Sequence, residues 1–465
     1  MVENQIIRKS IGFYLLLLLF SVTFTLVFQG FQDFLLSLFL PILDILALNQ
    51  FFRKGKNLSE RSFIHSIFFW SLFIRVLAVF VMGKILVVYN GMPFISDKDD
   101  YNYQMAAIEI LERWKISGFG FYDDIRFSSD TYSGFPNFSA ALMYLFGTSF
   151  WVPRIGNAVL SSFTVVLGYK ICRKYADTDS ARFLGVFLCL LPFTIIFCSL
   201  QLKDTLLLFF MTLALYSSSN ILENKRIIKS IFLLTISFIG ISFCRPATIV
   251  PILGGLICMG IDNILFRHSR HFLLKLLVFI VVFVLLMQSY QFLNSLGFES
   301  MDDYFTSRYE KMSNTSIQNS KSNIKNLSIA AYLGAPLYIL GGFFLPPALL
   351  VDLGESINYP AWGVLQHFAF LPFLIPAMFS CIANRKRNQI PFFLLLVFIL
   401  LRVGQANSLF TVFSPRQSLG TVFLMYLMLP MYRPVKKGWQ TAIMIISLVV
   451  LASYNLVRLY SHGLF

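Results

Sequence analysis

Apolar runs, most of them close to 20 residues long, recur along the whole chain and alternate with short polar connections. A helix of about 20 apolar residues spans the hydrocarbon layer of a bilayer. By length, about 13 runs qualify as spans. They cover residues 11–28, 34–52, 63–89, 153–172, 183–200, 206–222, 231–243, 249–266, 276–292, 361–383, 390–403, 419–431 and 441–460. The pattern predicts an all-α protein, a polytopic transmembrane helical bundle.

The basic residues gather in alternate connections, which is the signature of cytoplasmic loops. They predict a cytoplasmic N-terminus and place the polar loops 90–134 and 294–326 on the external side. The alternation requires one further apolar segment, 332–353, not to cross. Its repeated Gly and Pro residues favour a re-entrant segment, because irregular backbone at membrane depth must be buried in protein or line a cavity.

Three regions follow from this order. Residues 1–62 hold two N-terminal helices and a basic cytoplasmic loop, residues 63–431 hold the core with its external loops, and residues 432–465 hold a C-terminal helix. Within the first external loop, residues 105–114 have apolar side chains at helical spacing. We therefore expect an amphipathic helix on the membrane surface there.

Composition agrees with a membrane protein, since 57% of the residues are hydrophobic and only 13% are charged. Soluble domains carry about 25% charged residues. The net charge of +15 sits mostly in the short basic loops, so it indicates topology and no nucleic-acid partner. The six cysteines lie in or beside apolar runs and are interpreted as packing residues.

Three carboxylates, Asp97, Asp99 and Asp100, stand within four positions directly after the run 63–89. Unpaired carboxylates inside an apolar bundle would each cost several kcal/mol. The loop is therefore expected at the membrane surface or in a cavity that opens to it, as part of an active site. The alternative is a solvated loop that caps the following helix.

Five further charged residues are predicted on the same side: Lys203, Asp204, Arg245, Arg402 and Arg416. A carboxylate can deprotonate an attacking hydroxyl, and cations stabilise a departing phosphate. This set therefore suits transfer of a sugar from a phosphate-linked lipid. Each member also has a structural alternative. Asp204 would cap a helix, Arg245 would reach the interface from a helix end, and Arg416 would be an anchor.

Five short motifs in order along residues 65–430 resemble the GT-C superfamily, the integral-membrane glycosyltransferases that use polyprenyl-phosphate-linked sugars. They are residues 99–107 (DDYNYQMAA), 153–158 (PRIGNA), 191–192 (LP) followed by 199–204 (SLQLKD), 245–247 (RPA) and 415–416 (PR).

The resemblance implies roles for individual residues. Asp100 would be the catalytic base or a metal ligand, with Asp99 and Asp97 as neighbours. Lys203 and Arg245 would face the lipid phosphate.

The remaining candidates rest on their predicted position. Arg402 and Arg416 would join the phosphate site, and Asp204 and Tyr103 would support it. Metal dependence stays open: Asp99 and Asp100 are suited to Mg²⁺ or Mn²⁺ if a metal is bound.

The expected function is a membrane glycosyltransferase, a hexosyl or pentosyl transferase of the bacterial inner membrane. Its donor would be a polyprenyl-phosphate-linked sugar and its acceptor a cell-surface glycan or lipid on the external face. One alternative is a polysaccharide polymerase that joins lipid-linked repeat units. Another is a flippase or transporter for a lipid-linked glycan, which would more often show an internal repeat with paired broken helices.

Overall fold

The computed structural model describes residues 58–95, 99–122, 133–266, 361–406, 416–434 and 437–461, together with Ala47 and Gln50. Every regular element in these ranges is a helix, so the all-α prediction is confirmed for them. The first two predicted runs, the run 276–292, the loop 294–326 and the re-entrant segment 332–353 lie outside the ranges just given. The count of 13 spans and the re-entrant segment therefore stay predictions.

The described helices follow the predicted runs closely. Two short 3-10 helices, η1 (Pro246–Thr248) and η3 (Leu429–Met431), accompany thirteen α-helices in this part of the chain. These are α3 (Glu60–Asn90), α4 (Asp99–Ser117), α5 (Gly134–Phe146), α6 (Trp151–Cys172), α7 (Thr178–Cys189), α8 (Pro192–Cys198), α9 (Lys203–Leu222), α10 (Ile227–Cys244), α11 (Ile249–Phe266), α15 (Ala361–Ala383), α16 (Gln389–Ala406), α18 (Leu419–Met428) and α19 (Lys437–Ser461).

Six segments of the described chain are long and apolar enough to cross a membrane, and four shorter apolar helices accompany them. The six begin at Glu60, Trp151, Thr178, Lys203, Ile227 and Gln366. Together with the hydropathy of the whole chain, they indicate a multi-pass membrane protein.

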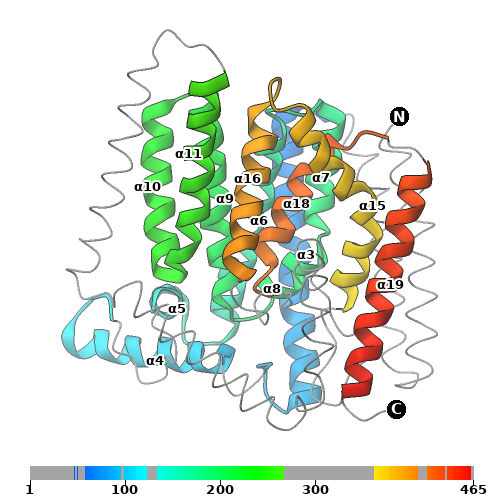
Figure 1. Cartoon of the computed structure of the whole chain (residues 1–465). Coiled ribbons are helices and arrows are strands. Elements are labelled where there is room, and N and C mark those ends of the chain that lie inside the picture. The colour runs from blue at the N-terminus through cyan, green and yellow to red at the C-terminus, as the bar shows by residue number, and fades with distance from the viewer. Residues whose placement is uncertain are drawn as a thin grey trace.

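The long helices run side by side, and α4 lies across one end of the bundle (Figure 1). We call this the α4 end: α3 and α10 finish there and α9 begins there. The predicted amphipathic helix of the first external loop is thus present as α4, which is longer than expected at both ends. Helix α5 begins at Gly134, so residues 134–136 form its first turn.

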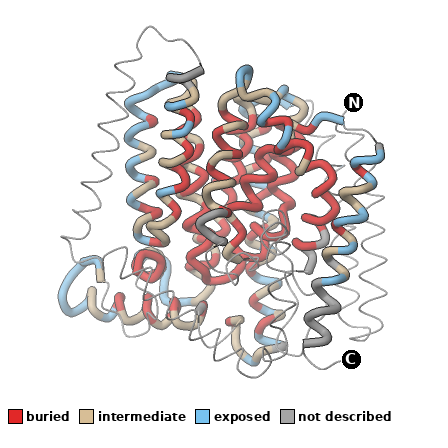
Figure 2. Tube along the Cα trace, viewed as in Figure 1, coloured by how far each residue is buried: buried red, intermediate tan, exposed pale blue. Residues whose placement is uncertain are grey.

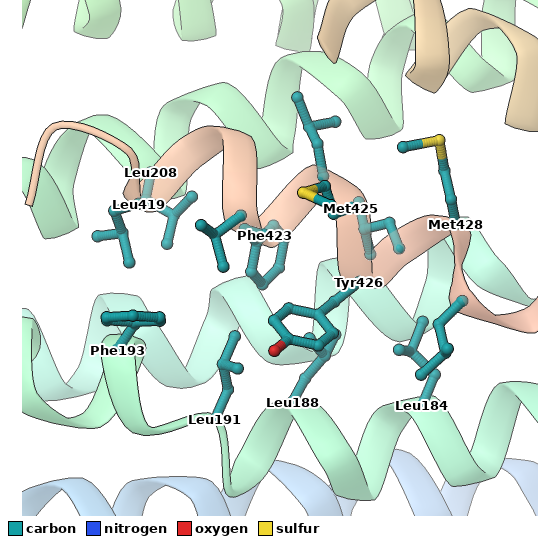
Figure 3. Close-up of a cluster of buried hydrophobic side chains, with 14 of the residues drawn as sticks. Leu184, Leu188, Leu191, Phe193, Leu208, Leu419, Phe423, Met425, Tyr426 and Met428 are labelled. Atoms are coloured by element: carbon teal, nitrogen blue, oxygen red, sulfur yellow. The ribbon is translucent and has the colours of Figure 1, made fainter. Parts of the chain in front are cut away.

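The core lies between α6, α7, α9, α15, α16 and α18, whose side chains are mostly buried, whereas α10 and α19 keep exposed outer faces (Figure 2). Helix α18 is enclosed along its length, and Phe423 and Tyr426 meet Leu188 of α7 in a tightly filled cluster (Figure 3). Exposed apolar side chains on α3, such as Phe69 and Phe73, are suited to lipid.

The run 183–200 was expected to be one helix, and this is wrong. The chain breaks at Leu190–Leu191, and α8 starts with Pro192 in its first turn. Proline has no N–H to donate and cannot continue the preceding helix, so the last carbonyls of α7 lose their partners in the chain.

Arg75 of α3 supplies those partners. Its guanidinium is fully buried and donates to the carbonyl oxygens of Leu188 (3.2 Å) and Cys189 (3.0 Å) and to Thr194 Oγ1 (2.9 Å). Its Nε donates to Ser161 Oγ of α6 at 2.7 Å. One arginine thus joins α3 to three other helices at the break. No role was predicted for Arg75, although a charge inside an apolar run indicates a constrained position.

Replacing Arg75 with Met should lower the free energy of unfolding by about 1–3 kcal/mol, because buried carbonyls lose their donors. Lysine at the same position should restore part of the loss, since it keeps a charged donor. Thermal unfolding in detergent measures both. Lys84→Met, which changes an exposed residue of the same helix, is the control. An Arg75→Met variant as stable as the control would show that the break holds without the arginine.

Candidate active site

Three charged side chains meet at the α4 end, from the start of α9, the end of α10 and the turn before α18. The Asp204 carboxylate accepts a hydrogen bond from Arg416 Nε at 2.5 Å and forms an ion pair with Arg245 Nη2 at 3.7 Å. The Asp204 side chain is only 3% exposed, whereas the two arginines are about a quarter exposed. The carboxylate is therefore the buried centre of the cluster, and the guanidinium groups form its outer part.

The local sequence explains how these residues reach one place. Helix α9 begins at Lys203 with no side-chain cap, and Asp204 lies in its first turn, where the helix dipole favours a negative charge. Helix α10 ends with Arg245 as its C-cap because Pro246 starts the next element. Asp204 makes ion pairs, so the alternative in which it caps α9 does not describe the structure.

A cavity of about 40 Å³ adjoins the cluster. Asp204, Arg245 and Arg416 line its charged side. Its apolar side is made by side chains of α9, α16 and the start of α18, namely Leu207, Leu208, Met211, Leu401 and Leu419. The charged side is suited to a negative head group and the apolar side to hydrocarbon, and a volume of about 40 Å³ holds only a small part of such an amphiphile.

Two further predicted cations lie near this end. Lys203 is 4% exposed and interacts electrostatically with Asp204. Arg402 is 1% exposed and donates to Ser418 Oγ at 3.2 Å. Ser418 follows Arg416 by two positions, so Arg402 supports the segment that carries Arg416.

Asp100 is placed differently from the expectation. It is 1% exposed, and its carboxylate accepts hydrogen bonds from the backbone N–H groups of Ile95 (2.7 Å) and Tyr101 (3.2 Å). The prediction of a water-facing carboxylate is wrong for Asp100, because backbone donors replace water around it. Asp100 is the second residue of α4 and binds the backbone on either side of itself, so it ties the preceding segment to the start of the helix. Asp100 does not line the cavity described above.

The other two predicted carboxylates are less defined. Asp99 opens α4, but its side chain lies outside the described part of the structure, as does the whole of Asp97. Tyr103 is 7% exposed and packs edge-on against Phe135 of α5, with ring centroids 5.3 Å apart. Tyr103 therefore joins α4 to α5.

Arg154 connects Asp100 to the bundle. It is fully buried in the first turn of α6, its Nη2 donates to the carbonyl oxygen of Pro93, and it attracts Asp100 electrostatically. Its guanidinium lies over the rings of Phe94 (5.6 Å) and Phe150 (5.2 Å). The motif at 153–158 contained Arg154, but no role was assigned to it. Arg154 and Asp100 hold the two ends of the segment 93–95.

The predicted Mg²⁺ or Mn²⁺ remains a prediction. Within the described ranges, no three His, Cys, Asp or Glu side chains come together as a metal site would require. The side chains of Asp97 and Asp99, on which the prediction depends, lie outside those ranges. All six cysteines are free, and five of them are buried, as expected for packing residues.

Residues 134–288 match the sequence model of the dolichyl-phosphate-mannose-protein mannosyltransferase family, which belongs to the GT-C superfamily of membrane glycosyltransferases. The match confirms the resemblance to that superfamily and supports a membrane glycosyltransferase of the GT-C type. It includes Arg154, Lys203, Asp204 and Arg245, whereas Asp100 lies before it. No protein of curated function matches the chain.

Proposed function

We propose that this chain transfers a sugar from a polyprenyl-phosphate-linked donor to a hydroxyl group of a cell-surface glycan or lipid. The observation that carries the proposal is the cluster of Asp204, Arg245 and Arg416 at the charged side of a cavity whose other side is apolar. The match to a GT-C family over residues 134–288 supports the same chemistry.

The donor phosphate would bind at the arginines. Guanidinium groups pair with phosphate oxygens through two parallel hydrogen bonds, and both Arg245 and Arg416 keep about a quarter of their side chains exposed. Asp204 already holds the guanidinium groups in place, so they need little reorganisation when charge develops on the leaving phosphate. Lys203 adds a further positive charge beside them.

The chemical step would proceed by direct displacement at the anomeric carbon of the sugar. The acceptor oxygen forms the new bond to that carbon, and the bond from carbon to phosphate oxygen breaks. The phosphate keeps the electron pair and is stabilised by the arginines. The proton of the acceptor hydroxyl passes to a carboxylate, for which Asp100 is our candidate.

The lipid part of the donor would lie against the apolar side of the cavity. Leu207, Leu208 and Leu401 line the cavity there, and the apolar helices around them would be embedded in the bilayer. The acceptor is defined only by its hydroxyl, so a polymerase that joins lipid-linked repeat units fits the same arrangement.

The proposed orientation of the chain in the membrane rests on the distribution of basic residues. Lys174, Lys225 and Arg387 lie in connections at the end of the bundle opposite to α4. Basic connections mark the cytoplasmic side, so the α4 end and the site would face outward from a bacterial inner membrane.

Alanine at Arg245 or Arg416 should raise the KM for the lipid donor. A hydrogen bond to a charged group contributes about 1.5–3 kcal/mol, which corresponds to roughly 10- to 100-fold. Transfer by purified protein in liposomes measures KM, and movement of labelled lipid between leaflets is recorded in the same liposomes.

Arg433→Ala is the matched control, because Arg433 is exposed at the opposite end and donates only to Asn384 Oδ1 at 2.8 Å among the interactions described. An unchanged donor KM in both site variants would remove the cluster from the donor site. Leaflet exchange without any transfer would favour the transporter instead.

A further inference from the structure

The connection between α8 and α9, residues 199–202, carries Lys203 and Asp204 directly after it. Asn157, in the second turn of α6, reaches this connection from a different helix. Its side-chain Nδ2 donates to the carbonyl oxygens of Leu200 (3.0 Å) and Leu202 (3.2 Å). Leu202 is the residue from which α9 starts. One amide group therefore fixes both sides of Gln201 and the start of the site-bearing helix.

The use of an amide here has a cost that packing alone does not explain. Asn157 is fully buried, both hydrogens of its Nδ2 are engaged, and its Oδ1 has no hydrogen-bond partner among the described residues. A buried acceptor without a partner is unfavourable, and such groups in a native structure call for an explanation. The two hydrogen bonds that fix the α8–α9 connection provide such an explanation.

Asn157 also lies one helical turn after Arg154, which holds the segment 93–95 next to Asp100. The start of α6 thus contacts both parts of the candidate site. Arg154 holds the backbone near the candidate base, and Asn157 holds the backbone near the candidate phosphate site. A shift of the connection would move Asp204, and with it the two arginines that Asp204 pairs with.

We infer that Asn157 is a positioning residue that fixes the α8–α9 connection so that Lys203, Asp204 and the paired arginines meet the donor phosphate. The inference rests on the proposed function, because it assigns Asn157 to donor binding at that site. Asn157 does not contact the donor itself; it acts through the backbone of Leu200 and Leu202.

Two measurements on the full-length chain test it, with Asn157→Ala, Asn157→Gln and Ser162→Ala as variants. Ser162 is the control because it is fully buried on the same helix and its Oγ donates to Ala158 within α6, away from the connection. The first measurement is hydrogen exchange of the peptide that covers residues 199–206, which needs no activity. Asn157→Ala should raise exchange there roughly tenfold, since two hydrogen bonds are lost, while Ser162→Ala leaves it unchanged.

The second measurement is the KM for the lipid donor. Asn157→Ala should raise it about tenfold, on the same loss of two bonds. Asn157→Gln keeps the donor amide and should recover part of the affinity. A purely structural defect reduces the amount of active protein, which lowers the maximal rate and leaves KM unchanged. If Asn157→Ala does not fold, Asn157→Gln carries both measurements, with smaller effects expected.

If Asn157→Ala leaves hydrogen exchange of the 199–206 peptide unchanged, the inference is overturned, whatever the activity of the protein. Raised exchange with an unchanged donor KM would also overturn it, because the connection would then move without consequence for the donor. Failure of the wild-type chain to transfer sugar would count against the proposed function instead, and it is seen in the assay before any variant is compared.

Discussion

Asp100→Asn is expected to lower the rate of sugar transfer by about 10²- to 10⁴-fold, the usual contribution of a general base. Asparagine keeps the size of the side chain and one acceptor, so Ile95 N–H can still be bound, but it cannot take the proton of the acceptor hydroxyl. The melting temperature should fall, because one backbone hydrogen bond and the attraction to buried Arg154 are lost, whereas the KM for the lipid donor should change little. Turnover in liposomes and thermal unfolding are the measurements.

The matched control is Glu109→Gln on the same helix. Glu109 forms a short-range ion pair with Arg113 (2.8 Å), so its loss removes a carboxylate from α4 without touching the backbone around Asp100. Near-normal transfer by Asp100→Asn would mean that this carboxylate only holds the segment 93–95. If Asp97→Asn or Asp99→Asn then abolished transfer, the base would be one of those two neighbours.

Asp204→Asn should have the second large effect, on both stability and activity. Removing one partner of a buried ion pair costs about 3–5 kcal/mol, and the lower value applies because the arginines keep some water. Transfer should fall about 10²- to 10³-fold, since Arg245 and Arg416 lose the carboxylate that orients them toward the leaving phosphate. Chemical unfolding and turnover measure the two losses separately.

A double variant sharpens this test. Asp204→Asn combined with Arg416→Gln leaves one fewer unpaired charge and should recover part of the lost stability without recovering activity. Coupling energies of about 0.5–3 kcal/mol are typical of groups in direct contact. Strictly additive losses from the two substitutions would show that the short Asp204–Arg416 contact does not contribute to the fold.

The sequence predicted the helices well because long apolar runs bounded by charge have few alternatives in a bilayer. Helix α15 begins and ends at the predicted residues, Ala361 and Ala383. The break between α7 and α8 was not predicted. Pro192 removes one backbone donor but is itself apolar, so the hydrophobic pattern continues across the break. The carbonyl groups exposed by this break are bound by Arg75, which lies more than 100 residues earlier in the chain.

The candidate site was predicted in part. Charge on one side of the predicted topology was enough to group Asp204, Arg245 and Arg416, and the structure brings these three together. The surroundings of Asp100 were not predictable in this way. Its partners are backbone N–H groups, which nearly every residue carries, so no side-chain pattern announces them. The roles of Arg154 and Asn157 were missed for a similar reason, because both act on carbonyl oxygens.

Arg75 also bears on how α3 enters the membrane while the chain is being synthesised. It stands at the middle of α3, and its partners on α6, α7 and α8 are synthesised at least 86 residues later. A nascent α3 therefore leaves the ribosome with a guanidinium at mid-helix, which disfavours membrane insertion by about 2.5–3.5 kcal/mol on the translocon scale. Within α3, Ser71 Oγ already accepts a hydrogen bond from Arg75 Nη1 at 2.6 Å, and the surrounding Phe, Leu and Val side chains must offset the rest of that cost. The remaining hydrogen bonds of Arg75 form only when α6 to α8 arrive, so we expect α3 to gain stability in the bilayer at that point.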